Sequence, residues 1–268
     1  MAADTDTEAG GEVPAGGLQG LFDRRLTGRS RTALLYGYLA VVFAAVLAPV
    51  IYTLPAAVGA NLGALTQELY VNSIINSFAL GLTVAVVATL LTTIAARFYR
   101  YVRYKNLYIL FMTLPLFVPG DTHAVAILAF VKQVGITPSF WTLVVAHVFY
   151  VFPFAFLMVL ATMAGLPQNI IAAAEDLGAN EFRAFFDVEL PMVADGVISG
   201  FLVSFLLSLN EAPRASVVGG RYETISGVIL SIYGAVGLDP TLYALNVFMV
   251  VLALVIIAII LSLTVLRS

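Results

Sequence analysis

The sequence predicts an all-α membrane protein with six transmembrane helices and a cytoplasmic loop of two helices. Hydrophobic residues make up 61% of the 268 residues, whereas only 11% are charged. A soluble domain is about half apolar and about a quarter charged, so this chain carries more apolar surface than one core can bury. Its long apolar runs recur at regular intervals, which is typical of helices that cross a bilayer several times.

Residues 1–31 are predicted to form a disordered cytoplasmic tail, and residues 32–268 a transmembrane domain. The tail is rich in Gly and acidic residues and becomes basic between Asp23 and Arg31. No apolar run typical of a signal peptide precedes it, so we expect a solvated tail that is not cleaved.

Six runs are long and apolar enough to cross a membrane, for which about 20 residues are needed. They cover residues 32–57, 74–96, 107–131, 140–163, 192–212 and 241–266. A shorter run from Ile225 to Leu238 has 14 residues and three glycines. At that length we expect a re-entrant or surface segment and not a seventh span.

The third run is interrupted by Pro115, Pro119 and Gly120, which predicts a broken helix. Backbone groups freed by such a break must find partners in protein or water, and broken helices often line transport pathways. A proline kink that only shapes helix packing explains Pro115 equally well.

The basic residues indicate the orientation of the chain. With an N-terminus inside, three of them lie outside: Lys132, Arg214 and Arg221. The other ten lie inside: Arg24, Arg25, Arg29, Arg31, Arg97, Arg100, Arg103, Lys105, Arg183 and Arg267. Because cytoplasmic loops are enriched in Lys and Arg, both termini are predicted to be cytoplasmic. The longest cytoplasmic connection then runs from about Ala164 to Pro191.

This connection has the pattern of a helix, a sharp turn and a second helix. Ala172–Ala174 favour a helix, and Gly178 stands where a helix commonly closes in the left-handed region. Asn180 fits the N-cap of the second helix. An aromatic stripe follows, formed by Phe182, Phe185 and Phe186. Spacing alone favours an amphipathic hairpin that only rests on lipid headgroups.

The order Ala-Ala, Asp-Leu-Gly-Ala, Phe and Leu-Pro resembles the cytoplasmic signature loop of permease subunits in binding-protein-dependent ABC importers. The matching residues are Ala173, Ala174, Gly178, Leu190 and Pro191. Ala172 replaces the family's leading Glu, so the ion pair of that position with the ATPase is not expected. Glu175 and Asp176 follow one turn later as substitutes.

The resemblance extends from Asn76-Ser77 to the last apolar run. SFLLSLNEAPRASVVGG, YETISGVILSIYGAVGLDPTLYAL and the Phe152-Pro153 span are most similar to the polyamine (spermidine/putrescine) branch of these permeases.

The resemblance implies a permease of the cell membrane that forms half of a solute pathway. Two ABC ATPase subunits, which carry the ATP and Mg²⁺, are the implied inner partners, and this chain itself needs no cofactor. A second permease, either a paralogue or a copy of this chain, and an extracytoplasmic solute-binding protein complete the implied complex. The implied ATPase-coupling loop contains Ala172, Ala173, Ala174, Glu175, Asp176, Gly178, Phe185, Leu190 and Pro191.

Ionisable and polar residues at membrane depth are the candidates for the solute pathway. They are Asp121 and His123, beyond the break in the third run, and Asn210 and Glu211, at the end of the fifth. For Glu211 the alternative is an ordinary helix-end charge at the interface, and an anionic or zwitterionic solute stays open. His147 is expected to be a hydrogen-bonded core residue.

The sequence favours neither catalysis nor nucleic-acid binding. It lacks a Gly-rich loop ending in Gly-Lys-Ser/Thr, so we do not expect the chain to hydrolyse ATP. No His-Glu-x-x-His is present, and no catalytic or metal site is predicted. The main alternative is a secondary transporter driven by an ion gradient through Asp121 and Glu211. Inverted repeats would favour it, and none is evident. A non-transporting scaffold is a third possibility.

Overall fold

The computed structural model describes residues 28–58 and 66–265, and it contains only helices and their connections in these ranges. Residues 1–27 of the predicted tail lie outside the described residues. Helix α2 (Gly28–Val58) begins before the predicted tail ends, and its stretch Thr32–Val58 is apolar enough to cross a membrane. By the contacts that residues make with one another, the chain forms two compact units, Met1–Tyr52 and Thr53–Ser268.

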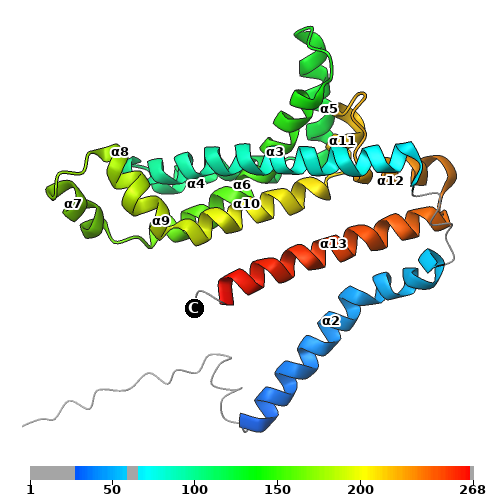
Figure 1. Cartoon of the computed structure of the whole chain (residues 1–268), viewed down its shortest axis with the longest axis horizontal. Helices are drawn as coiled ribbons and strands as arrows, with labels where there is room; N and C mark the ends of the chain where they lie inside the picture. The colour runs from blue at the N-terminus through cyan, green and yellow to red at the C-terminus, as the bar shows by residue number, and fades with distance from the viewer. Residues whose placement is uncertain (1–27, 59–65, 266–268) are drawn as a thin grey trace, which may run out of the picture. The chain divides into compact units, whose positions relative to one another are not determined.

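Three long helices form the core of the second unit: α3 (Glu68–Phe98), α6 (Phe140–Ala164) and α10 (Ala194–Leu209). They run alongside one another over most of their length (Figure 1). Glycines allow the close approach, because a Cβ atom at Gly81 would lie 3.0 Å from the Phe205 ring and one at Gly200 would lie 3.2 Å from Val159. Small residues at helix contacts are typical of membrane bundles.

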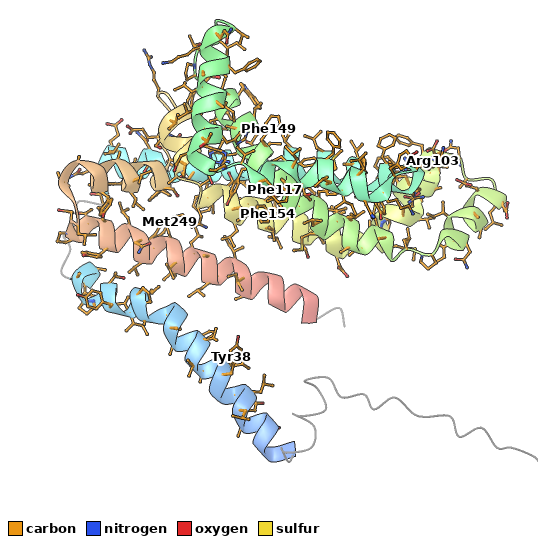
Figure 2. All side chains as sticks on the ribbon, turned by 180° about the vertical axis from the view of Figure 1, so that it is seen from behind. Tyr38, Arg103, Phe117, Phe149, Phe154 and Met249 are labelled. Atoms are coloured by element: carbon orange, nitrogen blue, oxygen red, sulfur yellow. The ribbon has the colours of Figure 1, made fainter. Side chains whose placement is uncertain are left out.

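The outside of this bundle is apolar. Large hydrophobic side chains project from it, among them Phe117 and Phe149, which are 75% and 51% exposed (Figure 2). Lipid tails, unlike water, solvate such a surface without a cost in free energy. The exposed apolar surface therefore supports the membrane assignment.

Among the described residues, four helices are long and apolar enough to cross a membrane, and two bent helix pairs raise the number to 6 if each pair is one span. The four helices include α13 (Pro240–Val265) and agree with the predicted first, second, fourth and sixth runs. The fifth run, predicted as a helix over residues 192–212, corresponds to the 16-residue α10, with a bend of 72° between it and the preceding segment.

The third run is broken, as predicted, and the break is sharp. The first part of the run is α4 (Lys105–Thr113) with the short turn η3 (Leu114–Phe117), and the second part is α5 (Gly120–Gln133). The axes of the two parts differ in direction by 92°. Val118 is extended, with φ −95° and ψ 121°. Pro119 explains this, because a residue before proline is kept out of the helical region.

A short helix, α12 (Ile225–Val236), follows α10 and α11 (Pro213–Val218). With 12 residues α12 is too short to cross a membrane, as predicted for this run. Ser77 of α3 accepts a hydrogen bond from the Ile225 N–H at 2.8 Å, and Ser226 donates to the Leu209 carbonyl. The start of α12 is therefore attached to both α3 and α10.

Candidate functional site

The predicted two-helix loop is present at one end of the three-helix core, opposite to α12 (Figure 1). We call residues 168–192 the 168–192 segment. It contains α7 (Gln168–Asp176), α8 (Glu181–Arg183), a π-helical turn η4 (Ala184–Glu189) and α9 (Leu190–Met192).

The turn between the two helical parts is at Gly178, as the sequence predicts. Gly178 has φ 90°, in the left-handed region. Its N–H donates to the Glu175 carbonyl at 2.9 Å, and the Ala179 N–H donates to the Ala174 carbonyl at 3.0 Å. This pair of hydrogen bonds is a Schellman motif, which satisfies the last carbonyl groups of α7. Asn180 then caps α8, because its Oδ1 accepts from the Arg183 N–H at 2.9 Å.

One face of the 168–192 segment is exposed and apolar. Leu177, Phe182 and Phe186 are 90%, 71% and 46% exposed, and the rings of Phe182 and Phe186 lie 4.7 Å apart. None of these three is among the predicted coupling residues, of which Ala172, Ala173, Glu175, Asp176 and Pro191 have exposed side chains and Ala174 and Leu190 are half-buried. An exposed apolar patch on a loop is typical of a protein contact.

The residues of the predicted aromatic stripe pack against one another but differ in exposure. Phe185 is half-buried: its ring lies 4.9 Å from the Phe186 ring, edge to face, and the Arg97 guanidinium lies 4.6 Å from its centre. Phe185 therefore connects the end of α3 to Phe186, whereas Phe182 and Phe186 keep much of their surface exposed.

Beside Phe185, the 168–192 segment is attached to the end of α3 and to η2 (Tyr99–Tyr101), the 3-10 turn that continues it, by ion pairs that sequence reasoning missed. Glu189 is 1% exposed, and Arg100 donates to both of its carboxylate oxygens, at 3.0 and 2.5 Å. Arg97 lies 3.6 Å from the Glu189 carboxylate and 3.4 Å from that of Glu181. The only signals in the sequence are two arginines at the end of one apolar run and a carboxylate before Leu190, far apart along the chain.

The pathway candidates His123 and Glu211 come together at the opposite end of the core, through Arg214. Arg214 donates to Glu211 at 2.7 Å and to Nδ1 of His123 at 3.1 Å. Its guanidinium also lies 4.6 Å from the centre of the Tyr150 ring. Arg214 and Glu211 are 2% and 6% exposed. Glu211 is therefore a buried, paired carboxylate, unlike an ordinary helix-end charge at the interface.

The other two pathway candidates are outside this cluster. Asp121 is exposed in the first turn of α5. Asn210 is exposed as well, and its side chain donates to the Leu206 carbonyl of its own helix at 2.9 Å. His147 is a hydrogen-bonded core residue, as predicted: it is fully buried, with Nδ1 3.0 Å from the Ser208 hydroxyl.

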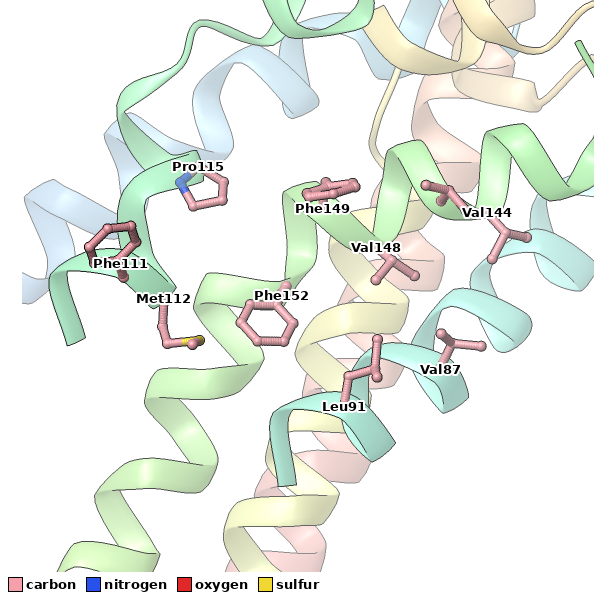
Figure 3. Close-up of a pocket in the computed structure, with 10 residues that line it drawn as sticks. Val87, Leu91, Phe111, Met112, Pro115, Val144, Val148, Phe149 and Phe152 are labelled. Atoms are coloured by element: carbon pink, nitrogen blue, oxygen red, sulfur yellow. The ribbon is translucent and has the colours of Figure 1, made fainter. Parts of the chain in front are cut away.

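A cavity of about 410 Å³ lies between α3, α4 and α6 and is lined by apolar side chains (Figure 3). Pro115 of the broken third run is one of them, and Leu91, Phe111 and Phe152 are others. Without a polar group this cavity offers nothing that selects a charged solute. Within residues 28–58 and 66–265, no group of three or more His, Asp or Glu side chains is placed to hold a metal ion.

Residues 103–268 match the family model described as "Binding-protein-dependent transport system inner membrane component". The chain is 32% identical to the spermidine/putrescine transport system permease protein PotC of Haemophilus influenzae over 192 residues, which are 70% of this chain and 74% of that protein. It is 33% identical to PotC of Escherichia coli K12 over 138 residues, about half of each protein (51% and 52%). It is 29% identical to the putrescine transport system permease protein PotI of the same organism over 167 residues, 60% of this chain and 59% of that protein.

Solved structures share the fold. A bacterial importer of the acidic polysaccharide alginate has a chain with a TM-score of 0.67 at 16% identity, covering 87% of this chain and 95% of that one. An amino acid ABC transporter has one with a TM-score of 0.57 at 17% identity, covering 75% of this chain and 94% of that one. The family match covers more than half of the residues, and the fold agrees with it. The chain therefore belongs to the family of binding-protein-dependent transport system inner membrane components, and it is a permease subunit of an ATP-driven ABC importer, forming part of the solute translocation pathway.

Proposed function

We propose that this permease imports polyamine-like cations and that its 168–192 segment docks on an ABC ATPase. The observation that carries the substrate class is the 32% identity to a spermidine/putrescine permease over 192 residues. Both termini are cytoplasmic in this proposal, because ten of the thirteen basic residues then lie inside. The 168–192 segment then faces the cytoplasm, where ATP is available.

The exposed side chains of the 168–192 segment and its attachment to the bundle support the docking. Leu177, Phe182 and Phe186 offer exposed apolar surface to a protein partner, while Glu189 and Phe185 attach the segment to the bundle. A separate ATPase subunit binds ATP and Mg²⁺ and hydrolyses the nucleotide. This chain supplies the contact through which the ATPase changes the conformation of the permease.

The complete complex in this proposal contains two ATPase subunits, a second permease and an extracytoplasmic binding protein. A second permease, either a paralogue or a copy of this chain, is needed because one bundle does not enclose a pathway. Glu211 is the acid proposed to act on the cation in the outer part of the pathway. Since Arg214 already neutralises this carboxylate, an ammonium group of the solute must compete with the guanidinium for it.

The test is uptake by the complete complex in proteoliposomes. We expect ATP-dependent uptake of labelled spermidine or putrescine, inhibited by an excess of either unlabelled amine. An acidic oligosaccharide and neutral amino acids should not compete. ATP-dependent uptake of the anionic solute instead would contradict the substrate class but keep the ATP-driven mechanism. Uptake that follows an imposed ion gradient without ATP would favour the secondary transporter.

A further inference from the structure

We infer that Arg97, Arg100, Glu189 and Phe185 form a clasp through which the 168–192 segment moves helix α3 directly. The four residues position the segment and transmit its movement, and the inference rests on the proposed docking of an ATPase. The Leu-Pro signature and the Gly178 turn both lie within the segment and determine its own structure. The clasp, in contrast, attaches the segment to residues that are far from it in the sequence.

The first support is the geometry of the ion pairs. Arg100 binds the two carboxylate oxygens of Glu189 with two nitrogens, at 3.0 and 2.5 Å. Such a bidentate contact fixes orientation as well as distance. Arg100 belongs to η2, and Arg97, one turn earlier on α3 itself, lies over the Phe185 ring and also pairs with Glu181. Two points of attachment on each element resist both sliding and rotation.

The second support is burial. The Glu189 side chain is 1% exposed, and those of Arg100 and Arg97 are 15% and 21% exposed. A buried carboxylate left without its partner is strongly unfavourable, so the clasp stays closed while the segment moves. An exposed pair of the same charges would exchange readily with water and would transmit little.

The third support is the contrast with the covalent connections of the segment. The chain leaves α6 through Gly165, Leu166 and Pro167, which are not helical. It enters α10 after a bend of 72° at Val193. Neither connection therefore continues α6 or α10 into the segment as one uninterrupted helix. The clasp joins the segment to the end of α3 and to η2, in addition to the apolar packing of Ala184.

Helix α3 reaches from the clasp to the opposite end of the bundle. Its 31 residues correspond to a length of about 46 Å at 1.5 Å per residue. Near its start, Asn76 donates to the Glu223 carbonyl at 3.1 Å and Ser77 holds the start of α12. A movement of the 168–192 segment is thus passed by one rigid element to the residues before α12, next to the Arg214 cluster. Coupling between distant sites requires such a contiguous element.

The test uses the complete complex and a readout that does not depend on the solute. The chain has no cysteine, so Asn72→Cys places a single label site on the exposed outer part of α3. We expect its labelling rate to change several-fold when ATP is added. In Glu189→Gln, ATP hydrolysis and complex assembly should persist, whereas the ATP-dependent change at position 72 should be lost. Arg103→Gln, an exposed arginine beside the clasp, is the matched control and should behave like the parent.

Reversing the charges of the ion pair distinguishes a variant that no longer transmits the movement from one that no longer folds. Arg100→Glu combined with Glu189→Arg should restore the ATP-dependent labelling change that Glu189→Gln lacks. Arg100→Lys, which keeps the charge but loses the bidentate contact, should give a partial change. A full change at position 72 in Glu189→Gln would overturn the clasp, as would loss of ATPase binding in all clasp variants. No ATP-dependent change at position 72 in a parent complex that still takes up solute with ATP would also overturn the clasp, whereas a parent that does not bind the ATPase would contradict the proposed docking.

Discussion

Gly178 determines the shape of the 168–192 segment because only glycine enters its backbone conformation without strain. With φ 90°, a β-branched residue there costs roughly 1 kcal/mol or more. We expect Gly178→Val to insert into the membrane but to lose stimulation of the ATPase and uptake. Gly165→Ala is the control, since Gly165 has φ −81° and a Cβ atom there would meet nothing closer than 3.6 Å. Normal uptake by Gly178→Val would show that the turn does not position the segment.

Glu211 and Arg214 form a buried pair whose separation leaves one charge without a partner. Glu211→Gln and Arg214→Met should each lower stability by roughly 3–5 kcal/mol, as expected when one member of a buried ion pair is removed. The double variant Glu211→Gln/Arg214→Met should be closer to the parent. Thermal unfolding midpoints in detergent compare the four proteins, with the exposed Arg221→Gln as control. Additive losses in the double variant would contradict a direct pair.

At the scale of elements, the proposed docking of the 168–192 segment depends on its exposed aromatic side chains. Phe182→Ser with Phe186→Ser removes the exposed patch, so we expect ATPase subunits to dissociate while the permease stays folded. Tyr101→Ser is the control, because Tyr101 is also exposed (62%) and lies at the same end of α3 but outside the segment. Copurification of the ATPase with each variant gives the answer. Retained ATPase binding in the Phe182/Phe186 variant would place the docking surface elsewhere.

Local signals in the sequence predict local structure well. Gly178 and Asn180 have the turn and cap that their residue types favour, and Pro119 breaks the third run where proline requires it. Contacts between distant residues were not predictable, because no spacing rule joins Arg100 to Glu189 or His123 to Arg214. Those pairings depend on how helices pack. Phe185 illustrates the same limit, since a stripe in sequence does not tell which ring turns inward.

At the scale of the whole molecule, the orientation proposed from the asymmetry of the basic residues can be tested. Single cysteines at Ala179 should be protected from impermeant reagents in intact cells, whereas a cysteine at Arg221 should react. Arg221 is exposed, unlike the nearby Gly219, where a Cβ atom would collide with the carbonyl oxygen of Ala215. Rapid labelling from outside at position 179 would exclude contact between the 168–192 segment and a cytoplasmic ATPase.

The central claim is that the 168–192 segment transmits the nucleotide state of an ATPase to the membrane bundle. A photo-crosslinking residue at Leu177, which is 90% exposed, tests it most directly in the complete complex. We predict a cross-link to the ATPase subunit whose yield or position changes when ATP is bound. A cross-link only to lipid, or one to the ATPase that is indifferent to nucleotide, would contradict the claim.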